Sequence, residues 1–192
     1  QFQYTYSSIG FSILSGLGVC AAYCLIGACW LIMKTEGALQ AKAKLWAKNC
    51  GRITFFAILS VCSINPIINP AVMKVWFTLP QAIYLLNLPL FCFCLLALNH
   101  WLLSLSIKKS TVPCWLNFAI TIAIFICCFL GLLISFYPFI VPNTLTIWQS
   151  AAATESLQFL LYGALVVIPC IFMYTVFSYR VFWGKVRPLE YY

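Results

Sequence analysis

The chain has 192 residues, of which 64% are apolar and only 7% charged, and its formal net charge is +8. Because an average soluble domain has roughly 25% charged residues, this composition excludes a water-soluble globular protein. The positive charge does not indicate a nucleic-acid partner here. In membrane proteins, basic residues collect beside the cytoplasmic ends of the helices, and this explains the surplus. The sequence therefore predicts an integral membrane protein.

Five stretches are long and apolar enough to cross a bilayer, which takes about 20 residues. In chain order they cover residues 9–33, 53–71, 82–107, 115–141 and 157–181. They are continuously apolar, without the two-residue alternation of barrel strands, so we expect helices. The predicted fold class is an all-α polytopic membrane protein, a bundle of four helices plus one peripheral helix, in a single transmembrane domain covering 1–192.

The first predicted span has small residues at every fourth position, which let two helices approach closely in lipid. The row consists of Ser12, Gly16, Cys20, Cys24 and Ala28. We expect it to form a tight helix–helix contact rather than a ligand site.

The segment after this span, residues 37–51, has the pattern of a further helix. One face carries Leu39, Ala43, Trp46 and Cys50, with lysines elsewhere. This pattern is typical of a helix that extends from the bilayer or lies on an anionic leaflet.

Late in the second predicted span stand Asn65, Pro66, Asn69 and Pro70. Proline frees backbone carbonyls and bends a helix, and broken helices line the sites of some transporters. A small membrane transporter or channel subunit is therefore an alternative function. The matching interruption of an inverted repeat is missing, however, and five spans do not divide into equal halves.

Candidate metal and haem ligands are few. His100, the single histidine, stands near the end of the third span and could ligate haem. One histidine cannot supply both axial ligands of a bis-histidine haem, so we expect an interfacial residue bonded to a helix or headgroup. The eleven cysteines contain no Cys-x-x-Cys pair and are expected to be packing residues. We expect no metal site, cofactor site or catalytic residue in this chain.

The three acidic residues are Glu36, Glu155 and Glu190, and none falls at mid-bilayer. An intramembrane carboxylate relay within this chain is therefore not expected. Glu155, with Thr154, fits the N-terminus of the fifth helix, where a carboxylate meets the positive end of the helix dipole. Glu36 can pair with Lys34 or with another subunit.

Ten of the eleven basic residues fall on one side of the predicted spans, and Lys74 alone falls on the other. The ten are Lys34, Lys42, Lys44, Lys48, Arg52, Lys108, Lys109, Arg180, Lys185 and Arg187. By the positive-inside rule the N-terminus is external and the C-terminus cytoplasmic. All seven tryptophans fall near predicted span ends, as an aromatic belt requires.

Three segments carry a specific resemblance to a known family. The segment GACWLIMKTEGALQ (27–40) is similar to one that closes a membrane helix in subunit II of cytochrome bd-type quinol oxidases, especially the cyanide-insensitive branch. YPFIVPNTLTIWQSAAATESLQF (137–159) resembles that subunit's late external loop, and IPCIFMYTVFSYRVFWGKV (168–186) resembles its final helix and basic tail. One departure is Gln149, where the family often has an acidic residue.

The resemblance implies that this chain is the C-terminal part of such a subunit, the last five of nine spans, and the missing initial Met agrees with this. It implies a complex of the bacterial cytoplasmic membrane that oxidises quinol and reduces dioxygen to water. Its haems, two of type b and one of type d (or a b-type substitute), are carried by partner subunit I. The expected role of this chain is then structural. Lys34, Glu36, Trp148 and Glu155 are its candidate residues for subunit docking or lipid contact.

Overall fold

The structure is a computed structural model that describes residues 6–68, 73, 76, 81–105, 113–141 and 144–185. It contains two compact units, which divide between residues 137 and 138. Predictions for several residues therefore lie outside the described part of the chain; these are Asn69, Pro70, Lys74, Lys108, Lys109, Arg187 and Glu190.

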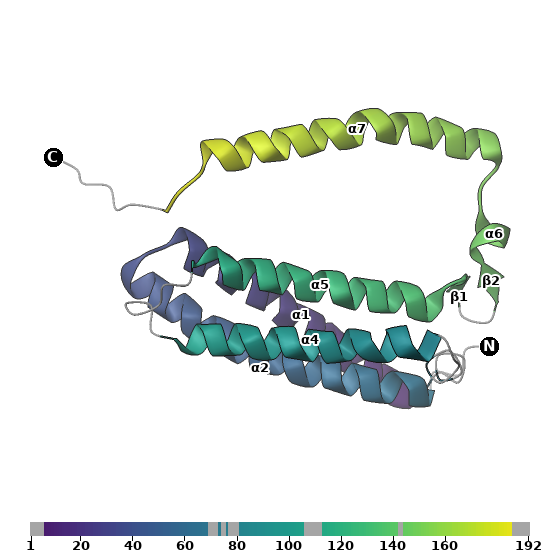
Figure 1. Ribbon diagram of the computed structural model, residues 1–192. Helices are drawn as coiled ribbons and strands as arrows, with labels where there is room; N and C mark the ends of the chain where they lie inside the picture. The colour runs from purple at the N-terminus through teal and green to yellow at the C-terminus, as the bar shows by residue number, and fades with distance from the viewer. Residues whose placement is uncertain are drawn as a thin grey trace. The chain divides into compact units, whose positions relative to one another are not determined.

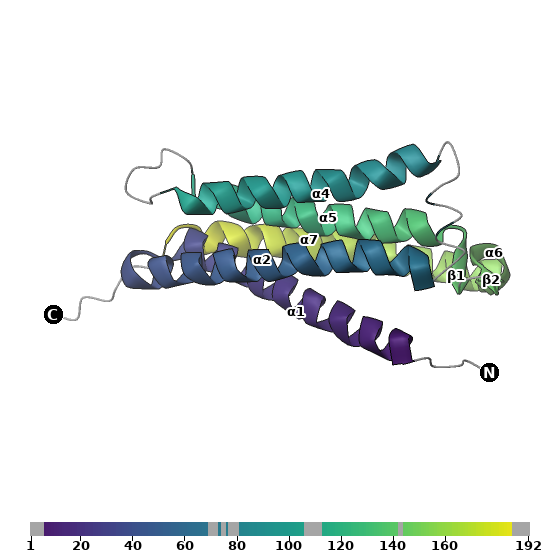
Figure 2. The same ribbon diagram turned by 90° about the horizontal axis from the view of Figure 1, so that it is seen from below.

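The first unit contains four long helices, shown in Figure 1 and, from another side, in Figure 2. They are α1 (Tyr6–Lys34), α2 (Gly37–Ile68), α4 (Gln81–Ser104) and α5 (Trp115–Phe136). Contacts join α1 to α2, α2 to α4, α4 to α5, and α5 back to α1. The four helices thus close a ring, and the predicted four-helix bundle is confirmed for this unit.

The second unit contains a short hairpin and one further long helix. Strands β1 (Phe139–Val141) and β2 (Leu145–Thr146) pair antiparallel, followed by α6 (Ile147–Ser150) and α7 (Thr154–Val181). With α7, five helices in the described part of the chain are long and apolar enough to cross a membrane. The all-helical class with five apolar helices is therefore confirmed.

The inner face of α1 differs from the predicted small-residue row. Of that row only Ala28 is buried, whereas Gly16, Cys20 and Cys24 are exposed. The reason is helical geometry: a spacing of four drifts about 40° per step around a straight helix. The face that packs inward steps by three and four residues instead, through Ala21, Leu25, Ala28, Cys29 and Ile32.

Helix α2 is continuous from Gly37 to Ile68, so residues 37–51 and the described part of the second predicted span, 53–68, form one helix. At 32 residues it is about 48 Å long, enough to extend beyond about 30 Å of hydrocarbon. Pro66 lies inside it without ending it. This continuous helix agrees with a helix extending from the bilayer rather than one lying on its surface.

The apolar face of residues 37–51 is divided between the interior of the bundle and its surface. Ala43 is fully buried, together with Ala47, but Leu39 and Trp46 are exposed. Small alanine side chains allow α2 to approach its neighbours closely, whereas leucine and tryptophan at those positions would hold the helices apart.

The fourth predicted span ends five residues early, because α5 stops at Phe136 and residues 139–141 form β1. Pro138 explains the change, since proline disfavours helical geometry in the residue before it. Tyr137 accordingly has φ −59° and ψ 134°. The Pro138 carbonyl accepts a hydrogen bond from Ile147 N at 3.0 Å and so helps to close the hairpin.

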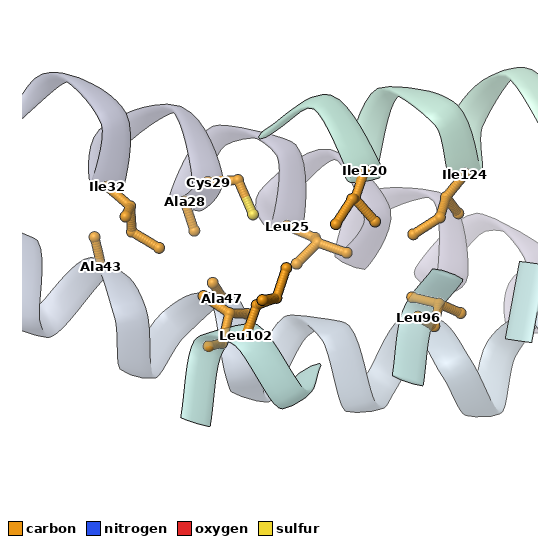
Figure 3. Packing of buried hydrophobic residues seen from close by; sticks show 11 residues of the cluster. Leu25, Ala28, Cys29, Ile32, Ala43, Ala47, Leu96, Leu102, Ile120 and Ile124 are labelled. Atoms are coloured by element: carbon orange, nitrogen blue, oxygen red, sulfur yellow. The ribbon is translucent and has the colours of Figure 1, made fainter. Parts of the chain in front are cut away.

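The core of the bundle is built from small and branched apolar side chains that point toward one another from all four helices (Figure 3). Its members are Leu25, Ala28, Cys29, Ile32, Ala43, Ala47, Leu96, Leu102, Leu103, Ile120 and Ile124. These residues come from the last turns of α1 and α4 and the first turns of α2 and α5. The core therefore lies toward one end of the bundle.

Candidate functional site

The end of the bundle that contains this core also carries the bundle's described positive charges. We call it the basic end. It includes Lys34, Lys42, Lys44, Lys48 and Arg52, which are all the basic residues described in the bundle. Trp30, Trp46, Trp101 and Trp115 stand at the same end. The five basic residues come from the end of α1 and from α2, and the four tryptophans come one from each helix of the bundle.

Two side chains of α2, one turn apart, satisfy carbonyls at the ends of two neighbouring helices. Gln40 Nε2 donates to the carbonyl of Ile32 in the last turn of α1, at 2.9 Å. Lys44 Nζ donates to the carbonyl of Leu105, which follows α4. Helix C-termini leave four carbonyls without intrahelical donors, and a cation there also meets the negative end of the helix dipole. These two bonds tie α1 and α4 to α2.

A second set of polar contacts lies inside the bundle. Asn99 Nδ2 donates to Thr121 Oγ1 at 3.3 Å, joining α4 to α5. The Thr121 hydroxyl lies 2.8 Å from the Asn117 carbonyl and 3.4 Å from Cys29 Sγ of α1, and can donate to either. All these groups are uncharged, and the arrangement can align helices. Among the described residues, the side-chain oxygens of Asn99, Asn117 and Thr54 are buried without a hydrogen-bond partner.

A groove of about 460 Å³ runs between α2 and α4 beside this network. Its walls are residues of α2 between Ala47 and Phe56 and residues of α4 between Leu96 and Ser104. Two of the lining side chains, Arg52 and His100, can carry positive charge. Arg52 Nη2 donates to Asn49 Oδ1, on the turn of α2 closer to the basic end. No carboxylate lines this groove within the described part of the chain.

The residues that line this groove do not fit a haem. Haem iron is commonly held by histidine, methionine, cysteine or tyrosine. Of these residue types, the groove lining contains only His100. His100 is also exposed rather than enclosed. Among the described residues, histidine, cysteine, aspartate and glutamate form no cluster of three or more that could hold a metal ion.

Of the eleven cysteines, Cys29 and Cys92 are buried, whereas Cys20, Cys24, Cys94 and Cys170 are exposed. Cys29 is part of the apolar core, and Cys92 and Cys128 bring their Sγ atoms to 4.0 Å across the α4–α5 contact. All eleven are free thiols in this structure.

Two of the four predicted docking residues lie where α1 meets α2: Lys34 ends α1, and Glu36 is in the turn. Lys34 Nζ lies 5.3 Å from the centre of the Trp30 ring, and Trp30 packs edge-on against Phe118 of α5 at 5.1 Å between ring centres. Such cation–π contacts contribute about 0.5–1 kcal/mol at exposed sites. Lys34 is thus held against the bundle, whereas the Glu36 side chain is exposed.

The other two, Trp148 and Glu155, belong to the second unit. Trp148 lies in α6 and is 76% exposed. Glu155 lies in the first turn of α7, where the positive end of the helix dipole stabilises a carboxylate. The predicted capping is only partly right, because the N-cap residue is Ala153 and it makes no side-chain cap bond.

Gln149 takes part in a cap at the start of the preceding helix, α6. Its N–H donates to Thr146 Oγ1 at 3.4 Å, and its Oε1 accepts from Thr146 N at 3.1 Å. This reciprocal capping box accepts either glutamine or glutamate at the third helical position. The departure from an acidic residue at Gln149 therefore keeps the local order of the turn.

Sequence reasoning missed the Asn99–Thr121 pair, the two caps from α2 and the groove. A signal was present for the pair, since isolated polar residues within apolar spans usually face a neighbouring helix. The caps and the groove depend on which turns of α2 and α4 lie side by side, and no local pattern carries that information.

Comparison with known proteins adds a match along nearly the whole chain. The family model described as cytochrome bd terminal oxidase subunit II matches residues 4–182. No match was found among curated protein sequences.

Proposed function

Because the chain belongs to the cytochrome bd terminal oxidase subunit II family, we propose that it is the structural and assembly subunit of a respiratory oxidase. Members of this family are subunits of a haem-containing quinol oxidase. Membership therefore implies association with subunit I of that oxidase. In the proposal, the complex oxidises quinol and reduces dioxygen to water. Its haem b and haem d, or a b-type substitute, are bound by subunit I.

The observation that carries the structural role is the chemistry of the bundle interior. Its buried polar side chains are Gln40, Thr54, Asn99, Thr121 and Ser135. They are all uncharged, and three of them, Gln40, Asn99 and Thr121, take part in bonds between helices. Such groups hold helices in register but cannot ligate haem or pass electrons. We therefore assign no catalytic residue to this chain.

The proposal also sets the placement of the chain in the bacterial cytoplasmic membrane. The basic end of the bundle faces the cytoplasm, so the N-terminus of this chain is external and the C-terminus cytoplasmic. Lys34, Glu36, Trp148 and Glu155 serve subunit docking or lipid contact. The charge distribution described above supports this orientation.

The test is to purify the chain with its partner subunits and record haem absorption spectra. We expect His100→Ala and substitutions of the cysteines to leave the spectrum of the complex unchanged. Loss of one haem signal on His100→Ala alone would contradict the proposal. Substrate flux through the isolated chain in liposomes would favour a transporter instead, and obligate co-purification with a haem-bearing partner would exclude that alternative.

A further inference from the structure

The groove between α2 and α4 has a polar end and an apolar end. Toward the basic end, Arg52, His100 and Ser104 line it; toward the middle of the bundle, Phe55, Phe56 and Leu96 do. The two helices run antiparallel here, so polar residues of one helix lie beside polar residues of the other. This gradient matches a molecule with a charged head and an apolar tail.

The polar part of the groove lies at the depth expected for lipid headgroups. The apolar span of α4 runs from Leu86 to Ser104, about 28 Å of helix, which is close to the hydrocarbon thickness of about 30 Å, and His100 and Ser104 stand in its last turns. Trp101, which lines the groove and is 59% exposed, is of the type that marks the interface. Arg52 bonds Asn49, one turn nearer the basic end, as expected for a side chain that reaches toward the headgroups.

The charge of the groove selects an anion. Arg52 is always protonated and donates to the neutral amide of Asn49. The groove lining contains no carboxylate to neutralise it, within the described residues. Guanidinium binds phosphate through paired hydrogen bonds.

We propose that this groove binds one anionic phospholipid from the bilayer, with its phosphate on Arg52 and one acyl chain along Phe55 and Phe56. The site lies within the four-helix bundle and does not depend on where the haems of the complex are bound. It differs from the docking candidates at Lys34 and Glu36, neither of which lines the groove.

The test uses the full chain purified with its partner subunits in detergent, stripped of loosely bound lipid and then exposed to palmitoyl-oleoyl-phosphatidylglycerol. Bound lipid is counted by native mass spectrometry. We expect retention of one lipid per chain, weakened about fivefold by Arg52→Gln, since one basic residue near the membrane surface contributes about that factor. Arg52→Lys keeps the charge and is expected to retain most of the binding.

Lys42→Gln is the matched control, because Lys42 is an exposed basic residue of the same helix outside the groove. Equal losses for Arg52→Gln and Lys42→Gln would indicate general surface attraction and overturn the site. Equal retention of phosphatidylcholine would overturn its anionic selectivity. Two further measurements distinguish a phospholipid from a free phosphate ion. We expect Phe56→Ser to weaken lipid retention, because it removes part of the apolar wall. Displacement of the lipid by millimolar inorganic phosphate would identify a free-anion site and contradict the proposal. Recovery of a quinone from the groove in place of phospholipid would also contradict it.

Discussion

Gly18 of α1 faces Ala57 of α2 so closely that a Cβ built on Gly18 would lie 2.7 Å from the Cβ of Ala57. Two real Cβ atoms essentially never approach so closely. The Cβ of Ala57 is attached directly to the α2 backbone, so it cannot move aside unless the helix moves. The two helices therefore touch through a glycine and an alanine, the kind of contact that brings helices together in lipid.

A larger side chain at Gly18 should separate α1 from α2. We expect Gly18→Leu to destabilise the purified complex by about 1–3 kcal/mol, the usual cost of overpacking, read as a lower thermal midpoint in detergent. Gly16→Leu is the control, because a Cβ at Gly16 meets nothing within 4 Å. A similar loss in both variants would argue against the Gly18–Ala57 contact.

The Asn99–Thr121 hydrogen bond should couple α4 to α5. We expect Asn99→Leu and Thr121→Val each to lower stability, with a coupling energy in a double-mutant cycle of roughly 0.6 kcal/mol, the average for such bonds in membranes. Unfolding of the two single variants and the double variant measures it. Strictly additive effects would mean that the two side chains do not act together.

The cap from Lys44 to the Leu105 carbonyl should stabilise the end of α4. Lys44→Met removes the donor while keeping an unbranched apolar chain, so we expect a loss of about 1 kcal/mol. Hydrogen exchange of the last turn of α4 should rise. Lys42→Met, which alters an exposed side chain of the same helix, should leave that exchange unchanged, and a rise there would show that the effect is not specific to the cap.

The capping box at Thr146 and Gln149 should hold the turn before α6. Gln149→Ala removes the bond from Thr146 N to the Gln149 side chain, so we expect a loss of about 1 kcal/mol of local stability, seen as faster exchange of the amides of residues 147–150. Gln149→Glu retains the acceptor and should behave like the parent chain. If glutamate loosened the turn as much as alanine, the side-chain bond would not be what orders it.

The five spans and the one-sided charge of the bundle could be predicted because composition and run length decide them locally. The inner face of α1 could not, because Gly16 and Gly18 are equally small, and only the position of Ala57 on another helix decides which one is at the contact. The same holds for the candidate site. His100 and Asn99 were visible as polar residues in an apolar span, but their places beside Arg52 and Thr121 depend on helix pairing. Pro138 was a local signal for the end of α5, and the hairpin that follows it was not foreseen.

The turn between α1 and α2 has a consequence for how the chain enters the membrane. Only Thr35 and Glu36 separate the two helices, and Gly37 begins α2 with φ +68°, a conformation that favours glycine. Contacts between segments so near in sequence carry a small loop-closure cost and form early. We therefore expect α1 and α2 to insert as a preassembled helical hairpin during synthesis, onto which α4 and α5 pack as they emerge. A damaging substitution at Gly18 would then act first on the yield of inserted protein, before any effect on the finished bundle.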